Sequence, residues 1–448
     1  MYKKLILTLF MALSAFAADK PNIIYIMADD MGYADAGCYG QKVIKTPYLD
    51  QMAKEGIRFT DCYSGAPVCA PARSVLMTGL HTGHTRVRGN MGKLGVEGAV
   101  KGLTGKPRVP LQADDVTIAE VMKEAGYHTG MTGKWGLGDP NTPGIPNDQG
   151  FDEWFGYLNQ ARAHTYYPTF IWKNREKFPL PGNQNGKKTQ YTHDMCTDFA
   201  LDFVKRNKDK PFFLYLPYCI PHSKFEIPDT APYTDLDLKK NEKVYAAMIT
   251  RMDRDIGRLF SLLKELKLDE KTIVFFTSDN GAANRYDGVF DSSGPLKGYK
   301  RKMYEGGLRV PMIVRWPGKI KANQVSDTAW TFTDFFPTCA ELGSAKTPDN
   351  LDGVSIVPTL LGQKQDLSSR FLYWEFYEGG FKQAARWKNW KAVRQMKGKK
   401  LVTEIYDLSK DIGEENNLAS KKPELVAEFE KVFAKEHKPS LTWKAPID

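Results

Sequence analysis

A short segment in the first fifth of the chain places a thiol beside a proline and an arginine. It reads Cys69-Ala70-Pro71-Ala72-Arg73-Ser74-Val75-Leu76-Met77-Thr78-Gly79. Proline suits the first turn of a helix, where its missing N–H needs no partner, so we expect Cys69 at or just before a helix N-terminus. The free N–H groups and the helix dipole favour an anion there, and Arg73, one turn on, adds a forked cation. The segment therefore predicts a reactive side chain next to an oxyanion site.

The alternative for Cys69 is a packed or disulfide-bonded side chain. In a chain of this composition, Cys-x-Pro-x-Arg is expected by chance on the order of 0.01 times, which makes a chance match a poor explanation. Six cysteines in 448 residues do not make a disulfide scaffold. The spacing leaves the pairing of the other five open, namely Cys38, Cys62, Cys196, Cys219 and Cys339.

Polar side chains follow several buried strands at the point where each strand ends. They are Asp29, Asp30, Lys134, His222, Asp279 and Asn280. Because ligand sites in open α/β sheets lie at the carboxyl ends of the strands, we expect these groups at one edge of the sheet. Asp29, Asp30, Asp279 and Asn280 offer only oxygen ligands and three formal negative charges, which suits a hard cation such as Ca²⁺ better than a zinc pair.

The elements that must position these groups alternate along the chain. Continuous apolar strands are expected at 21–28, 57–60, 127–131, 211–216, 272–278 and 311–316, and helices at 46–56, 116–125, 192–205 and 245–266. This alternation predicts a mostly parallel sheet with helices on both faces. Residues 151–185 look aromatic and irregular.

After about Leu361 the pattern changes to shorter, alternating strands. They are expected at 370–376, 384–394 and 403–408, followed by an amphipathic helix at 423–437. We therefore predict a catalytic domain over residues 19–361 and a small C-terminal subdomain of antiparallel sheet and helix over 362–448.

The N-terminus predicts export. Residues 1–18 carry a basic start, an apolar run from Leu5 to Phe16 and small residues at Ala17 and Ala18, which is typical of a signal peptide. The mature protein is then expected in the periplasm or outside the cell, without a membrane anchor. Loss of Lys3 and Lys4 with this leader lowers the formal charge from +10 to +8. Such an excess can attract a polyanionic substrate or can belong to a solvated surface, and its dispersal argues against nucleic acid.

At Cys69 to Gly79 the chain resembles the type I sulfatases of the alkaline phosphatase superfamily, whose signature is Cys-x-Pro-Ser/Ala-Arg followed by Thr-Gly. The resemblance implies that a separate maturation enzyme oxidises Cys69 to formylglycine. It also implies that the hydrated aldehyde is the nucleophile in sulfate ester hydrolysis.

The resemblance extends from Pro21 to about Pro358. It implies that Asp29, Asp30, Asp279 and Asn280 hold Ca²⁺ together with residue 69. Lys134, in Thr132-Gly133-Lys134-Trp135, matches the sulfate-binding lysine of the family. His222 matches its histidine after the Phe-Leu-Tyr strand, and Lys300 the lysine four residues before Tyr-Glu-Gly-Gly. These three residues and Arg73 are then expected to bind the sulfate, with His222 or Lys300 protonating the leaving alcohol.

One position departs from the family pattern. The histidine expected two residues after Lys134 is Gly136 here. By residue type alone His84, His164 and His193 are candidates to replace it, and the sequence does not choose among them.

For the substrate, loop residues with amide, basic and aromatic side chains suggest a sugar. Candidate contacts are Arg88, Asn90, Arg162 and His164, which could stack on or hydrogen-bond a ring. A sulfated carbohydrate is the expectation from the family. The alternatives are a phosphonate monoester or phosphodiester hydrolase with the same apparatus, or a protein that only binds sulfated glycans.

Overall fold

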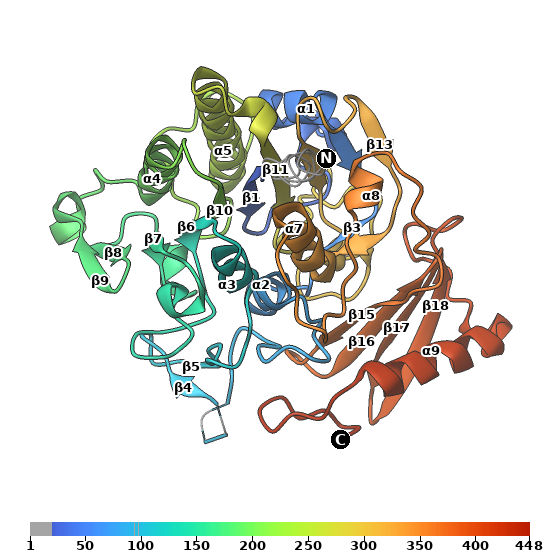
Figure 1. Ribbon diagram of the computed structural model, residues 1–448. Coiled ribbons are helices and arrows are strands. Elements are labelled where there is room, and N and C mark those ends of the chain that lie inside the picture. Colours follow the sequence, from blue (N-terminus) through green and yellow to red (C-terminus); the bar gives the residue numbers. More distant parts are fainter. Residues whose placement is uncertain (1–19, 94, 97) are drawn as a thin grey trace, which may run out of the picture.

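The computed structural model of the chain describes residues 20–93, 95–96 and 98–448 and arranges them around one large sheet (Figure 1). In these residues the sheet has ten strands, in the order β13-β2-β12-β11-β1-β10-β6-β7-β8-β9. Their bounds are β1 (Asn22–Ala28), β2 (Ile57–Phe59), β6 (His128–Lys134), β7 (Glu153–Tyr157), β8 (Phe170–Lys173), β9 (Glu176–Pro179), β10 (Phe212–Pro217), β11 (Thr272–Ser278), β12 (Met312–Arg315) and β13 (Gln324–Ser326). The signal peptide predicted for residues 1–18 lies outside the described residues.

The centre of this sheet is parallel. Strands β11, β1, β10, β6 and β7 run in the same direction, with Ile24 of β1 opposite Val274 and Leu214. Strand β12 pairs antiparallel with β11 and β2, and β8 and β9 form an antiparallel hairpin at the other edge. The mostly parallel α/β sheet is therefore confirmed, with antiparallel strands toward its edges.

Helices cover both faces of the sheet because successive side chains of each central strand point to opposite sides. On β1, Tyr25 packs in one apolar cluster with α2, α3 and α7, whereas Ile24 packs in a second cluster with α1, α4 and α5 (Figure 1). The bounds of these helices are α1 (Pro47–Lys54), α2 (Cys69–Thr78), α3 (Ile118–Glu124), α4 (Thr192–Arg206), α5 (Lys240–Glu265) and α7 (Phe335–Gly343).

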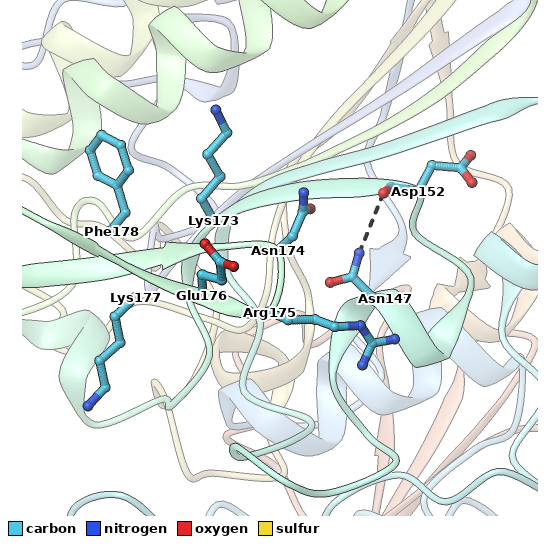
Figure 2. Close-up of a pocket in the computed structure, with 8 residues that line it drawn as sticks. All are labelled: Asn147, Asp152, Lys173, Asn174, Arg175, Glu176, Lys177 and Phe178. Atoms are coloured by element: carbon cyan, nitrogen blue, oxygen red, sulfur yellow. Dashed lines mark hydrogen bonds between the residues drawn. The ribbon is translucent and has the colours of Figure 1, made fainter.

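Residues 151–185 are more regular than expected, because they contribute β7, β8 and β9 to the sheet. The irregular interpretation was wrong because these strands are only four or five residues long, too short to give a periodic signal. In the β8–β9 hairpin Trp172 lies opposite Lys177 and Lys173 opposite Glu176. Lys173 and Lys177 therefore point to opposite faces of the hairpin, as Figure 2 shows.

The C-terminal residues form a separate antiparallel sheet covered by a helix. Its strands pair in chain order, β15 (Leu372–Phe376), β16 (Lys382–Trp387), β17 (Trp390–Lys397) and β18 (Lys400–Asp407). Helix α9 (Pro423–Glu436) packs Phe429 and Phe433 on Ala385 and Ile405. The single strand expected at 384–394 is two strands, because Lys388 adopts a left-handed turn conformation with φ 53°. A small antiparallel C-terminal sheet is thus confirmed.

Shorter elements connect these layers. They are β3 (Cys62–Tyr63), β4 (Val100–Lys101), β5 (Pro107–Arg108), β14 (Trp330–Thr331), α6 (Glu305–Leu308), α8 (Val357–Leu360) and the 3-10 turns, among them η3 (Arg162–His164). All six cysteines lie in the described part of the chain, and each is a free thiol. Within the same residues no helix combines the length and the apolar character needed to cross a membrane.

Candidate active site

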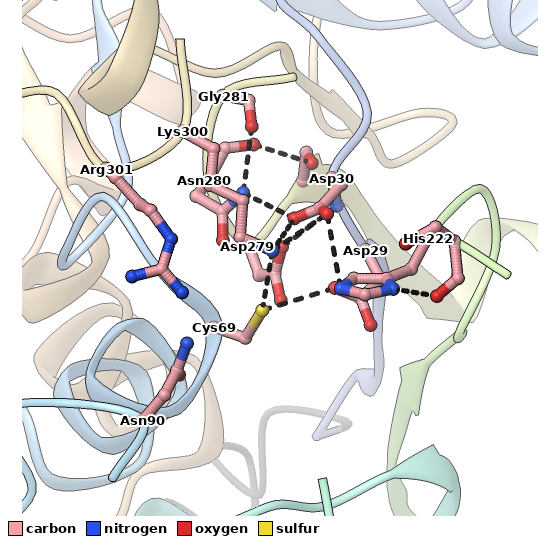
Figure 3. A network of polar contacts seen from close by, with 12 residues as sticks. Asp29, Asp30, Cys69, Asn90, His222, Asp279, Asn280, Gly281, Lys300 and Arg301 are labelled. Carbon is pink, nitrogen blue, oxygen red and sulfur yellow. Dashed lines mark hydrogen bonds and ion pairs between the residues drawn. The ribbon is translucent and has the colours of Figure 1, made fainter. Parts of the chain in front are cut away.

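The predicted polar residues meet at the carboxyl edge of the parallel strands (Figure 3). Asp29 and Asp30 directly follow β1, Asp279 directly follows β11, and Lys134 is the last residue of β6. His222 follows β10 by five residues, and its Nε2 lies 3.4 Å from Asp30 Oδ2. Parallel strands deliver their ends to one edge, so residues from four separate segments form one buried cluster.

Cys69 is the first residue of α2 and points into this cluster. Its Sγ lies 3.4 Å from Asp29 Oδ1 and 3.4 Å from Lys300 Nζ, and the residue is 1% exposed. Burial, together with the nearby carboxylate of Asp279, raises the pKa of the Cys69 thiol far above its ordinary value. An unmodified Cys69 is therefore a neutral thiol at physiological pH and a weak nucleophile.

Arg73 lies one turn along α2 and ties the cluster together. Its Nη2 and Nε donate to Asp279 Oδ2 at 2.7 and 3.2 Å, and its Nη1 donates to the carbonyl oxygen of Lys134 at 2.6 Å. The guanidinium is fully buried and also lies 3.7 Å from Asp29. A forked cation of this kind fixes two strand ends relative to the helix that carries Cys69.

Two lysines complete the positive lining. Lys134 Nζ contacts Asp29 Oδ2 at 2.5 Å, and Lys300 Nζ contacts both oxygens of Asp30 at 2.6 and 2.8 Å. Burial alone would raise the pKa of Asp29, but Lys134, His222 and Arg73 hold it well below its usual range. The site therefore keeps ionised carboxylates beside several cations in a setting that excludes water.

The acidic residues can accept a hard cation. Asn280 donates its Nδ2 to Asp30 Oδ1 at 2.7 Å, but its buried Oδ1 has no hydrogen-bond partner. A buried amide oxygen without a donor is costly unless something positive satisfies it. With the carboxylates of Asp29, Asp30 and Asp279 it forms an all-oxygen donor set, which fits Ca²⁺.

The three histidines considered as replacements at Gly136 lie in different surroundings. His84 pairs with Asp352 at 2.9 Å and His193 with Asp255 at 3.0 Å. His164 instead stacks on His222, with ring centroids 3.8 Å apart and planes 14° apart. Of these three candidates, only His164 contacts a residue of the cluster.

Gln160 is a site residue that sequence reasoning missed. A Cβ added at Gly136 would lie 3.0 Å from Gln160 Oε1, so the carboxamide of Gln160 fills the space that a histidine side chain would enter. Its Nε2 donates to Asn90 Oδ1 at 2.7 Å, and its buried Oε1 has no partner. A signal was present in the sequence, because Gln160 lies in the same amide-rich loop as Arg162 and His164.

The four predicted substrate contacts divide between the site and other regions. Asn90 Oδ1 accepts from the backbone N–H of Ala70 at 3.0 Å, next to Cys69, and His164 stacks on His222 as described. Arg162 shares η3 with His164, and its guanidinium lies over the ring of Phe170. The structure does not bring Arg88 to the cluster, because its buried guanidinium donates to Thr85, Tyr377 and Lys438 in the packing against the C-terminal sheet.

Arg301 is a second residue that the sequence analysis did not single out. It follows Lys300 directly and adopts a left-handed conformation with φ 74°. Figure 3 shows its guanidinium on the same side as Asn90, facing Cys69. Its partner is Glu378, from the loop after β15, so the C-terminal part contributes to the rim of the site.

Comparison with known proteins identifies the family. The sulfatase family model matches residues 21–345, and the family described as N-sulphoglucosamine sulphohydrolase, C-terminal, matches residues 298–438. The chain is 34% identical over 370 residues to N-acetylgalactosamine-6-sulfatase of Canis lupus familiaris, covering 78% of this chain and 67% of that protein. It is 29% identical over 453 residues to steryl-sulfatase of Homo sapiens, covering 83% and 74%.

Solved structures agree with this assignment. The structure of Ps i-CgsB in complex with k-i-k-neocarrahexaose is similar with a TM-score of 0.79 and 31% identity, covering 94% of each chain. Phosphonate monoester hydrolase of Agrobacterium radiobacter shares the fold, with a TM-score of 0.67 at 20% identity, covering 93% of this chain and 95% of that one. The resemblance inferred from the Cys69 segment is confirmed: the chain belongs to the sulfatase family and is an enzyme that hydrolyses sulfate esters.

Proposed function

We propose that this sulfatase cleaves sulfate esters of carbohydrates with a formylglycine made from Cys69 and a Ca²⁺ ion held by Asp29, Asp30, Asp279 and Asn280. The hydrated aldehyde supplies the hydroxyl that attacks sulfur, and the cation supplies positive charge beside it. The observation that carries the proposal is the position of Cys69 Sγ, 3.4 Å from both Asp29 and Lys300.

The remaining residues act on the sulfate group. Lys134, Lys300 and His222 surround the carboxylates next to Cys69, and Arg73 holds Asp279 from the helix side. Fixed cations in a buried site stabilise the negative charge that develops on the sulfate oxygens in the transition state. We assign to His222 or Lys300 the transfer of a proton to the leaving alcohol.

His164 acts on the position of His222 rather than as a strong base. Burial, together with the neighbouring Lys134 and His222, lowers the pKa of His164 to about 2, and burial also lowers the pKa of His222. A neutral imidazole stacked on His222 fixes the orientation of that ring and leaves its own buried Nε2 without a protein partner. This nitrogen is available to a hydroxyl group of the substrate.

The carbohydrate assignment has support from the relatives and from charge. N-acetylgalactosamine-6-sulfatase is named for a sulfated sugar, and the structure of Ps i-CgsB contains a neocarrahexaose. The chain carries a formal charge of +10, or +8 without Lys3 and Lys4 of the leader, which favours an acidic saccharide. Export through the signal peptide and oxidation of Cys69 by a maturation enzyme belong to the same proposal.

The test is sulfate release by protein coexpressed with a formylglycine-generating enzyme. We expect turnover of 4-nitrophenyl sulfate and of defined sulfated saccharides, and slower turnover of 4-nitrophenyl phosphate and phenyl phosphonate esters. Cys69→Ala and Cys69→Ser are expected to fold and to bind saccharide without turnover, because alanine cannot be converted to the aldehyde and an unoxidised serine lacks the second hydroxyl of its hydrate. Wild-type turnover by either variant would refute the role of Cys69, and preference for the phosphorus esters would refute the assigned substrate.

A further inference from the structure

A pocket lies on one face of the β8–β9 hairpin. It has a volume of about 560 Å³. Its walls include Trp154, Leu158 and Trp172, with Asn174 and the ion-paired Asp148 and Arg175 at the side. Indole and aliphatic walls with a few amide and hydroxyl groups are the usual composition of a small-molecule or saccharide pocket.

Two cations next to this pocket have no acidic partner. Arg162 and Lys177 lie over the ring of Phe170, with the guanidinium carbon 4.1 Å and the ammonium nitrogen 5.0 Å from its centroid. Among the described residues neither side chain makes a hydrogen bond or an ion pair, whereas Arg175 on the same hairpin pairs with Asp148 at 2.5 Å. Burial without a neighbouring carboxylate lowers the pKa of Arg162.

The strand register places these cations on the pocket side of the hairpin. Lys177 lies opposite Trp172, so both project from the face that also carries Phe170, whose ring is 6.2 Å from that of Trp172. Lys173 projects from the other face (Figure 2). The unpaired cations and the apolar wall of the pocket are thus parts of one surface.

The same surface is joined to the sulfate site through residues 157–164. The carbonyl oxygen of Leu158, which lines the pocket, accepts from the N–H of Gly136 at 3.2 Å. At the other end of this segment, Arg162 shares η3 with His164, which stacks on His222. A sugar chain with one sulfate beside His222 can therefore extend toward Arg162 and Phe170.

We propose that Arg162, Lys177 and the Trp172 pocket form a subsite for a second acidic group, a sulfate or carboxylate, on a sugar unit next to the one whose ester is cleaved. This subsite rests on the proposed function. It further specifies the substrate as an oligosaccharide with more than one anionic group. Charge complementarity supports this occupant, because two unpaired cations on one aromatic ring lack the anion that a sulfated glycan brings.

The experiment compares two substrates in the matured enzyme. One is 4-nitrophenyl sulfate, which carries a single anion, and the other is a sulfated oligosaccharide with an acidic group on the neighbouring unit. The measured quantity is the ratio of kcat/KM for the oligosaccharide to kcat/KM for the aryl sulfate. We expect Arg162→Ala and Lys177→Glu each to lower this ratio about fivefold to fiftyfold and to weaken its dependence on salt. The matched control is Lys173→Glu, on the opposite face of the same hairpin, which is expected to leave the ratio unchanged.

A binding measurement separates this proposal from the proposed function. Calorimetry with the Cys69→Ala protein reports affinity for the oligosaccharide whether or not sulfate is released. Lys177 is exposed, so Lys177→Glu is expected to fold even if Arg162→Ala does not. Wild-type affinity and an unchanged ratio in Lys177→Glu, or an equal effect of Lys173→Glu, would overturn the subsite. Absence of sulfate release from both substrates would overturn the proposed function instead, and the calorimetric comparison would still decide the subsite.

Discussion

The imidazole rings of His164 and His222 stack in parallel, 3.8 Å between centroids. The two residues come from different elements, since His164 ends η3 and His222 follows β10. Their contact connects the loop before β8 to the cluster around Asp30, which His222 approaches to 3.4 Å. His164, which is not part of the family motif, thus fixes the orientation of His222, which is.

The first prediction concerns pH and the stability contribution of His164. The pKa of His164 is lowered to about 2 in the folded protein, against about 6.5 when unfolded. Between these pH values the unfolded state binds one proton more than the folded state, so the free energy of unfolding rises with pH. The contribution of His164 to stability is therefore lost as the pH falls below about 6.5. Lowering the pH from 7 to 5 should lower the free energy of unfolding by about 2 kcal/mol through His164 alone. His164→Asn should remove that part of the pH dependence, as measured by urea unfolding at the two pH values. Equal pH dependence in both proteins would contradict the low pKa.

The second prediction concerns Arg73. Replacing it with Met leaves the buried carboxylate of Asp279 without its cation, whereas Asp29 keeps Lys134 at 2.5 Å. The loss should lower the free energy of unfolding by about 3–5 kcal/mol. The matched control is Arg175→Met, which removes an exposed pair with Asp148 and should cost less than about 1 kcal/mol. Denaturant unfolding measures both. Similar losses in the two variants would show that Arg73 has no special structural role.

The third prediction concerns Gly136, where the family histidine is absent. Gly136 has φ 85° and its missing Cβ would lie 3.0 Å from Gln160 Oε1. Gly136→His should therefore lower stability by about 1–3 kcal/mol and should lower kcat/KM for aryl sulfate rather than raise it. Gly136→Ala separates backbone strain from the clash of the larger ring. A higher kcat/KM in Gly136→His would contradict this prediction, because it would mean that Gln160 does not prevent a histidine at position 136 from acting in the site.

The fourth prediction concerns the contact between the two sheets. Lys391 on β17 and Glu305 on α6 form a fully buried ion pair at 2.7 Å. Lys391→Met should lower the free energy of unfolding by about 3 kcal/mol because it removes the nearest cation from the buried carboxylate of Glu305, which keeps only Arg309 at 3.2 Å as an ion-pair partner among the described residues. The double variant with Glu305→Gln should be more stable than Lys391→Met alone, and a double-mutant cycle measures the coupling. Additive losses would mean that the pair does not couple the C-terminal sheet to helix α6.

The sequence predicted the parts of the site that follow strands. Asp29, Asp279 and His222 could be placed together because apolar runs mark their strands and parallel strands end at one edge. Cys69 could be placed at a helix start from Pro71 alone. Sulfate ester hydrolysis was inferred from the resemblance to sulfatases, because residue spacing alone does not predict the reaction.

The contacts between loops could not be predicted in the same way. Gln160 fills the space beside Gly136, and Arg88 turns toward the C-terminal sheet, yet both lie in segments without periodicity. Which of these side chains enters the site depends on packing between segments far apart in sequence. The choice of His164 over His84 and His193 has the same origin, because each of the other two is paired with an aspartate that the sequence does not place beside it.

The most direct test of the central claim measures sulfate release and the mass of the Cys69 peptide in the same coexpressed preparation. We expect specific activity on a sulfated saccharide to rise in proportion to the fraction of peptide that carries the aldehyde. Chelation of Ca²⁺ should lower activity without changing that fraction. Sulfate release at full rate from protein whose Cys69 peptide is wholly unmodified would contradict the account.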